Sequence, residues 1–226
     1  VSLRPDLSTV ETNATYDAIA SRLHGLELSI YVPIGYVLPS RLWKYEDENG
    51  NVSVAGREKG VQRLMAANLL KRLESSVASF RLTLERVHAN MTHTLDAIAA
   101  FGASGASDPA SLEFDQDGCD YDADDAETAE FMVGKKARYD LRDMDWVSWE
   151  RDIQSDVVIV EDLLALIADI DPAHDAKLVE LKRIISEKAT CPINPGNRKV
   201  IVFTAFADTS HYLYEQLRPL VVDELG

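Results

Sequence analysis

Apolar side chains recur at steps of three and four residues along one long stretch of the chain. From Val61 to Phe101 this stretch contains no proline and no glycine, and its spacing is that of one helical face rather than of a strand. It predicts a single helix over residues 56–101, which needs a partner helix to bury its apolar face. The apolar positions are Val61, Leu64, Met65, Leu69, Leu73, Val77, Phe80, Leu84, Val87, Met91, Leu95 and Ile98.

A second apolar stripe of the same spacing runs from Asp145 to Ala168. Pro172 follows soon afterwards, and proline ends helices because it lacks the N–H and clashes with the preceding turn. Shorter helices are predicted near residues 10–26 and 174–188. The pattern therefore predicts a mainly α fold, built on a long antiparallel helical hairpin or bundle.

Three short runs have the composition of strands, namely Leu28–Val32, Tyr36–Leu38 and Lys199–Thr204. The last is nearly continuous in β-branched residues, which is typical of a strand covered on both faces in a parallel sheet. A helix predicted over 207–224 follows it directly, so the C-terminus reads as a short β-α element. The sequence supplies no neighbouring strands for it, and we therefore expect a truncated piece of a larger lobe.

The charge of the chain is unevenly distributed. The 226 residues carry a net charge of −15, but residues 106–133 hold ten of the 38 acidic residues and none of the 23 basic ones. A self-repelling run without periodic apolar residues is predicted to be a disordered insertion. The rest of the chain is only modestly acidic, so the global charge does not exclude a nucleic-acid partner.

The chain has no apolar run of the roughly 18 residues that a membrane span needs, and no apolar signal core at its N-terminus. We therefore expect a soluble, cytoplasmic protein without a membrane partner. Cys119 and Cys191 form no CxxC pair, which gives no support for a zinc site or a disulfide scaffold.

Four segments together resemble the bacterial Swi/Snf-like helicases of superfamily 2, which are DNA-dependent ATPases. They are Asn68–Arg81 (NLLKRLESSVASFR), Arg138–Asp145, Asp175–Leu178 and Lys199–Leu217, the last being similar to that family's motif IV. The resemblance implies three parts: the exit from a first RecA-like lobe over 1–40, a helical protrusion over 41–190 that contains the acidic insertion, and the start of a second RecA-like lobe over 191–226.

The chain also departs from that family. It has no Gly-x4-Gly-Lys-Ser/Thr box, and no Gln-x-x-Gly-Arg-x-x-Arg motif that would supply an arginine finger. Asp124–Glu127 imitates a DExx box but follows no apolar strand. ATP and Mg²⁺ are therefore expected in the parent enzyme and not in this chain, for which we predict no catalytic residue, no metal and no ATP hydrolysis alone.

We predict five DNA-binding residues, Lys71, Arg72, Arg81, Thr204 and Phe206, of which the resemblance to motif IV implies the last two. The first three belong to a helical stretch, residues 57–88, with seven bases and three acids, and basic side chains gain affinity for DNA by counterion release. The alternative is a solvated face, or an intramolecular pairing in which Glu74 meets Arg81 or Lys71 on a neighbouring turn. For Thr204 the alternative is a helix-capping role together with Asp208.

The function predicted is that of a fragment of an ATP-dependent DNA helicase or translocase, contributing the inter-lobe helices and motif IV. Its partners would be DNA and the missing lobes of the same polypeptide. The alternative is a stand-alone helical module for protein–protein interaction. The sequence leaves the oligomeric state open.

Overall fold

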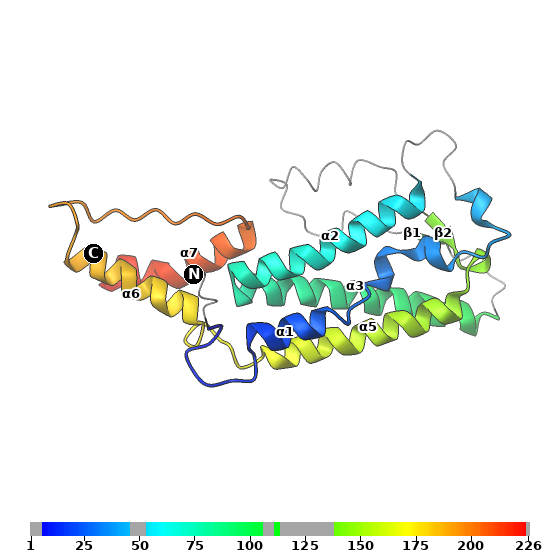
Figure 1. Cartoon of the computed structure of the whole chain (residues 1–226), viewed down its shortest axis with the longest axis horizontal. Coiled ribbons are helices and arrows are strands. Elements are labelled where there is room, and N and C mark those ends of the chain that lie inside the picture. Colours follow the sequence, from blue (N-terminus) through cyan, green and yellow to red (C-terminus); the bar gives the residue numbers. More distant parts are fainter. Residues whose placement is uncertain (1–5, 46–52, 106–110, 114–137, 225–226) are drawn as a thin grey trace. The chain divides into compact units, whose positions relative to one another are not determined.

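A computed structural model describes residues 6–45, 53–105, 111–113 and 138–224. These residues form a mainly α protein (Figure 1). Its α-helices are α1 (Tyr16–Leu23), α2 (Val54–Ser75), α3 (Val77–Ala103), α5 (Trp146–Leu166), α6 (Ala176–Thr190) and α7 (Ala207–Pro219), and a π-helical turn, Leu220–Glu224, follows α7. None of these helices has the length and apolarity needed to cross a membrane.

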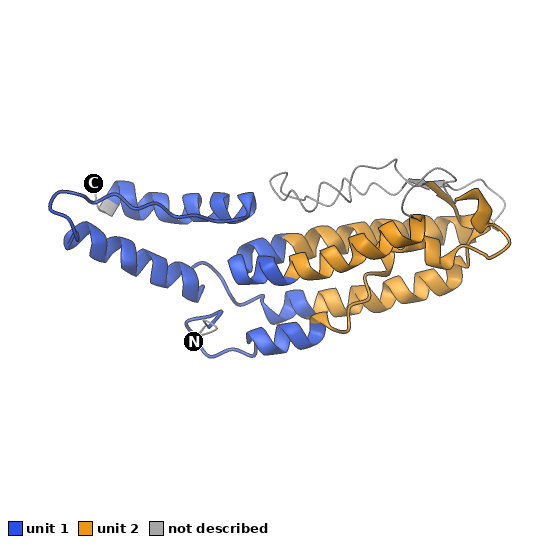
Figure 2. Ribbon diagram, turned by 45° about the horizontal axis from the view of Figure 1, so that its top comes forward, with its two compact units in different colours: residues 1–22, 70–82, 163–226 blue, residues 23–69, 83–162 orange. Residues whose placement is uncertain are grey.

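The chain divides into two compact units, which Figure 2 shows in different colours. Unit 1 comprises residues 1–22, 70–82 and 163–226, and unit 2 comprises residues 23–69 and 83–162. The sequence predicted three parts, with boundaries after residues 40 and 190, that would belong to different lobes of a parent enzyme. That division stays a prediction.

The core of unit 2 lies between segments of α2, α3 and α5, which run side by side (Figures 1 and 2). The apolar stripes predicted from the sequence form this core. Residues at most 4% exposed include Val61 and Met65 on α2, Val87, Met91 and Ile98 on α3, and Trp149, Ile153 and Val160 on α5. The three-and-four spacing therefore identified the buried helical faces correctly.

The prediction of one continuous helix over 56–101 is wrong, because the helix is interrupted at Ser76. The N–H of Ser76 donates to the carbonyl oxygen of Arg72 at 2.9 Å and closes α2. The Ser76 hydroxyl then accepts from the N–H of Ser79 at 3.0 Å, so Ser76 caps the N-terminus of α3. The two helices lie side by side (Figure 1), and we call residues 70–82 the α2–α3 corner.

The predicted strand Leu28–Val32 is also wrong, since Ser29–Tyr31 form a short 3-10 helix. The buried carboxylate of Asp156 accepts from the backbone N–H groups of Glu27 at 2.8 Å and Ser29 at 2.7 Å. Leu28 lies between them in the left-handed region, with φ of 54°. These N–H groups bond a side chain instead of a neighbouring strand, which explains the turn.

The second predicted strand, Tyr36–Leu38, is reduced to a single bridge. Val37 pairs with Met144, and the N–H of Leu38 donates to the carbonyl oxygen of Asp143 at 2.8 Å. A 3-10 helix, Pro33–Tyr36, occupies the residues before the bridge and leaves no length for a strand.

A short antiparallel pair joins Ser111–Glu113 (β1) to Arg138–Asp140 (β2), with Leu112 opposite Tyr139. β1 falls inside the stretch 106–133 that we expected to be disordered. The rest of that stretch lies outside the described residues.

In unit 1, α6 begins with a side-chain cap. One carboxylate oxygen of Asp175 accepts from the N–H groups of Lys177 at 3.0 Å and Leu178 at 3.1 Å. The other oxygen accepts from the hydroxyl of Tyr212 on α7 at 3.0 Å. One buried carboxylate thus starts α6 and ties it to α7.

The third predicted strand, Lys199–Thr204, is an irregular extended segment, so this prediction is wrong at the level of secondary structure. Its exposure alternates: Ile201 and Phe203 are 78% and 90% exposed, whereas Val200 and Val202 are 40% and 42% exposed. All four side chains are exposed, and the alternation is that of an extended chain whose successive side chains point to opposite sides. Among the described residues, no strand forms backbone hydrogen bonds with this segment, so it is not part of a sheet.

Glu58 on α2 is a buried carboxyl group that joins three parts of unit 2. It is 1% exposed, accepts from the N–H of Ile34 at 2.9 Å, and accepts from the hydroxyl of Tyr139 on β2. Burial raises the pKa of Glu58 from 4.5 to about 7, although both hydrogen bonds and Arg57 act in the opposite direction.

The raised pKa predicts how stability depends on pH. Because folded Glu58 holds its proton more tightly than the unfolded chain does, its stabilising contribution is complete below pH 4.5 and is lost as the pH rises through 7. Glu58→Gln keeps a neutral group there, so the variant should gain about 3 kcal/mol of unfolding free energy relative to wild type between pH 4.5 and pH 8. Urea titrations at several pH values measure this.

Glu85→Gln, on the exposed side of α3, makes the same change in net charge and serves as the control. A difference between Glu58→Gln and wild type that is the same at pH 5 and pH 8 would contradict the prediction.

Candidate nucleic-acid interface

Arg72 on α2 lies at the centre of a polar cluster in unit 1. Its side chain is 1% exposed, and its Nη1 donates to Asp208 Oδ2 at 2.6 Å and to Ser79 Oγ at 3.2 Å. Its guanidinium carbon lies 4.9 Å from the centre of the Phe206 ring. The charge of Arg72 is therefore balanced by a carboxylate and covered by an aromatic ring.

Hydroxyl groups surround this ion pair. Thr209 Oγ1 lies 2.9 Å from Ser75 Oγ and 3.1 Å from Ser76 Oγ, and Ser75 Oγ lies 3.4 Å from Thr204 Oγ1. These contacts join the α2–α3 corner to the start of α7. We call the set the Arg72 cluster; it consists of Arg72, Ser75, Ser76, Ser79, Thr204, Phe206, Asp208 and Thr209.

The cluster contains three of the five residues predicted to bind DNA, Arg72, Thr204 and Phe206. Lys71, the fourth, is exposed on α2 beside Arg72. Of these four, Arg72 and Phe206 are buried, whereas Lys71 and Thr204 are exposed. Lys71 and Thr204 are thus the two that a ligand in solvent can reach.

Arg81, the fifth predicted residue, has a different environment. Its Nη2 donates to the carbonyl oxygens of Ile167 at 2.6 Å and Ile170 at 2.9 Å, just beyond the end of α5. The carbonyl of Ile167, the residue that follows α5, carries partial negative charge, so a guanidinium there stabilises the helix end, and the carbonyl of Ile170 belongs to the turn beyond it. Arg81 thus acts as a C-terminal cap within unit 1.

Arg72 and Arg81 both make intramolecular contacts, but Arg81 does not make the expected pairing with Glu74. Arg72 pairs with Asp208, and Arg81 with backbone carbonyls, whereas the Glu74 carboxylate accepts from the Tyr16 hydroxyl at 3.1 Å. Thr204 accepts from the N–H of Phe206 at 3.3 Å, just before α7. The prediction that the five residues contact DNA remains a prediction.

Sequence reasoning missed Asp208 as the counter-ion of Arg72, since 136 positions separate the two. It also missed the hydroxyl groups of Ser75, Ser76 and Thr209. The consecutive serines were a usable signal, because serine in a helical pattern is a strong N-cap candidate.

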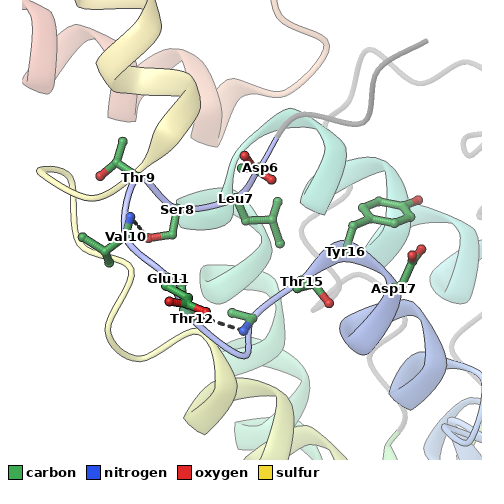
Figure 3. A pocket seen from close by; sticks show the side chains of 11 residues that line it. Asp6, Leu7, Ser8, Thr9, Val10, Glu11, Thr12, Thr15, Tyr16 and Asp17 are labelled. Carbon is green, nitrogen blue, oxygen red and sulfur yellow. Dashed lines mark hydrogen bonds between the residues drawn. The ribbon is translucent and has the colours of Figure 1, made fainter. Parts of the chain in front are cut away.

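A separate pocket of about 450 Å³ lies in unit 1 and is lined by residues 6–12 and 14–17 (Figure 3). Backbone N–H groups there donate to hydroxyls, from Val10 to Ser8 at 3.2 Å and from Ala14 to Thr12 at 2.7 Å. Its charged side chains are carboxylates, which do not suit a phosphate ligand. In the described part of the chain, no three His, Cys, Asp or Glu side chains are grouped to hold a metal ion.

No protein-family model, curated protein or solved structure matches this chain.

The capping role of Arg81 is testable by substitution. Arg81→Leu keeps an apolar stem but leaves the carbonyl oxygens of Ile167 and Ile170 without their charged donor. We expect the unfolding free energy to fall by about 1.5–3 kcal/mol, the usual cost of losing hydrogen bonds to a charged group. Lys71→Ala is the control, and because Lys71 is exposed we expect a change within about 0.5 kcal/mol. Equal effects of the two changes in urea titrations would contradict the capping role.

Proposed function

We propose that the chain is part of a Swi/Snf-like ATP-dependent DNA helicase or translocase. In this proposal it supplies a long antiparallel helical bundle between the lobes and the β-α element that opens a truncated second RecA-like lobe. The observation that carries the proposal is the Arg72 cluster. Two segments that separately resemble the family, Asn68–Arg81 and Lys199–Leu217, meet in that cluster through Arg72, Thr204 and Phe206.

The extended segment Lys199–Thr204 also supports the proposal. Its outward residues, Ile201 and Phe203, are 78% and 90% exposed, and large apolar side chains in such an extended run are typical of a strand that packs in a sheet. The missing lobe of the parent enzyme would supply the neighbouring strands and the covering layer.

The proposed share of this chain in the reaction is mechanical. ATP and Mg²⁺ would bind to motifs elsewhere in the parent enzyme, which carries out the hydrolysis in the cytoplasm. The bundle would transmit the movement of the lobes, and Lys71 and Thr204 would contact phosphates of the DNA. A hydroxyl and an ammonium group are both common phosphate ligands.

A second candidate is a stand-alone helical module that binds another protein. It is favoured by the exposed apolar side chains, since Trp43 in unit 2 is 69% exposed and tryptophan is enriched in protein interfaces. A module of this class would bind a protein without binding DNA.

DNA titration tests the proposal. Fluorescence anisotropy with a labelled duplex, from 50 to 200 mM salt, should show weak binding that falls steeply with salt. Lys71→Ala removes one phosphate contact, so the slope of log K against log salt should become less negative by about 1. The matched control is Lys182→Ala on α6, which should leave the slope unchanged.

Two results would count against the DNA-binding function. One is an absence of measurable binding by the wild-type chain at 50 mM salt. The other is an identical slope for wild type and Lys71→Ala, which would show that Lys71 contacts no phosphate.

A further inference from the structure

We propose that Arg72 is a positioning residue that acts on DNA only through the start of α7. It holds Asp208 and Phe206 in place, and it thereby fixes Thr204, whose hydroxyl would contact the phosphate. This inference rests on the proposed function, but it assigns Arg72 a role different from direct contact with DNA.

The burial of Arg72 argues against direct contact. Its side chain is 1% exposed, and its partner Asp208 is 21% exposed. A phosphate could reach the guanidinium only by displacing a carboxylate held at 2.6 Å. A cation already neutralised by a carboxylate has no free charge with which to displace counterions from DNA.

The geometry of the contacts explains how Arg72 could set the position of Thr204. The planar guanidinium donates to Asp208 in the first turn of α7 and lies under the ring of Phe206, the residue before α7. The N–H of Phe206 in turn donates to Thr204 Oγ1 at 3.3 Å. Two consecutive contacts thus lead from Arg72 through Phe206 to the exposed hydroxyl of Thr204, while the Asp208 ion pair holds the start of α7 and Ser75 Oγ lies 3.4 Å from the same hydroxyl.

The same geometry requires arginine. Lysine would keep the charge, but its ammonium group is not planar and cannot both bond Asp208 in one direction and stack on Phe206. A direct phosphate contact, by contrast, tolerates lysine well, because a phosphate accepts a point charge. Arg72→Lys therefore separates the two roles.

The test compares DNA affinity and salt dependence for Arg72→Lys, Arg72→Met and Lys71→Ala. Arg72→Lys and Arg72→Met should each weaken binding about tenfold, the effect of one misplaced charge-assisted hydrogen bond. Neither should change the slope of log K against log salt, whereas Lys71→Ala should make that slope less negative. Two results would overturn the positioning role: wild-type DNA affinity for Arg72→Lys, or a slope for Arg72→Met that is less negative than that of wild type by about 1.

Hydrogen exchange of the free protein provides a readout that does not depend on DNA. Both Arg72 variants should speed exchange of the Ser210 N–H, which donates to the carbonyl oxygen of Phe206 at 3.0 Å and closes the first turn of α7, while Thr204→Val should weaken DNA binding without this effect. Unchanged exchange at α7 in both Arg72 variants would overturn the inference. If both Arg72 variants exchange faster but the wild-type chain binds no DNA, the proposed function alone is overturned.

Discussion

A buried guanidinium requires an anion, because an unpaired charge in a protein interior is strongly destabilising. Arg72 meets this requirement with Asp208, which the sequence places far away on another helix. The pair brings the start of α7 to the α2–α3 corner, and the hydroxyl of Thr209 then bonds Ser75 and Ser76. The ion pair thus joins the same two elements, the α2–α3 corner and the start of α7, whose meeting carries the proposed function.

Unit 2 uses buried carboxylates in a related way, but without a buried cation. Asp156 is satisfied by two backbone N–H groups, and this arrangement replaces a strand with a turn at Leu28. Glu58 receives one N–H and the hydroxyl of Tyr139, and its burial raises the pKa to about 7. In both units, polar groups within the core decide where the chain turns, while the apolar faces decide which helices pack.

The helical faces could be predicted from the sequence because apolar spacing alone determines them. The interruption at Ser76 could not be read from that spacing, since Leu73, Val77 and Phe80 continue the stripe through the corner and are all buried. Arg72, Thr204 and Phe206 were singled out from the sequence and the structure brings them together, while their contact with DNA stays a prediction. The contacts within the cluster could not be predicted, because the partner of Arg72 depends on which helix packs against the α2–α3 corner.

The central claim is that Arg72 and Asp208 are energetically coupled, and a double-mutant cycle measures this coupling directly. Unfolding free energies of wild type, Arg72→Met, Asp208→Asn and the double variant should give a coupling of about 1.5–3 kcal/mol, the range for a close, poorly exposed ion pair. A coupling below about 0.5 kcal/mol would show that the pair contributes no more than an exposed surface contact, and it would contradict the account.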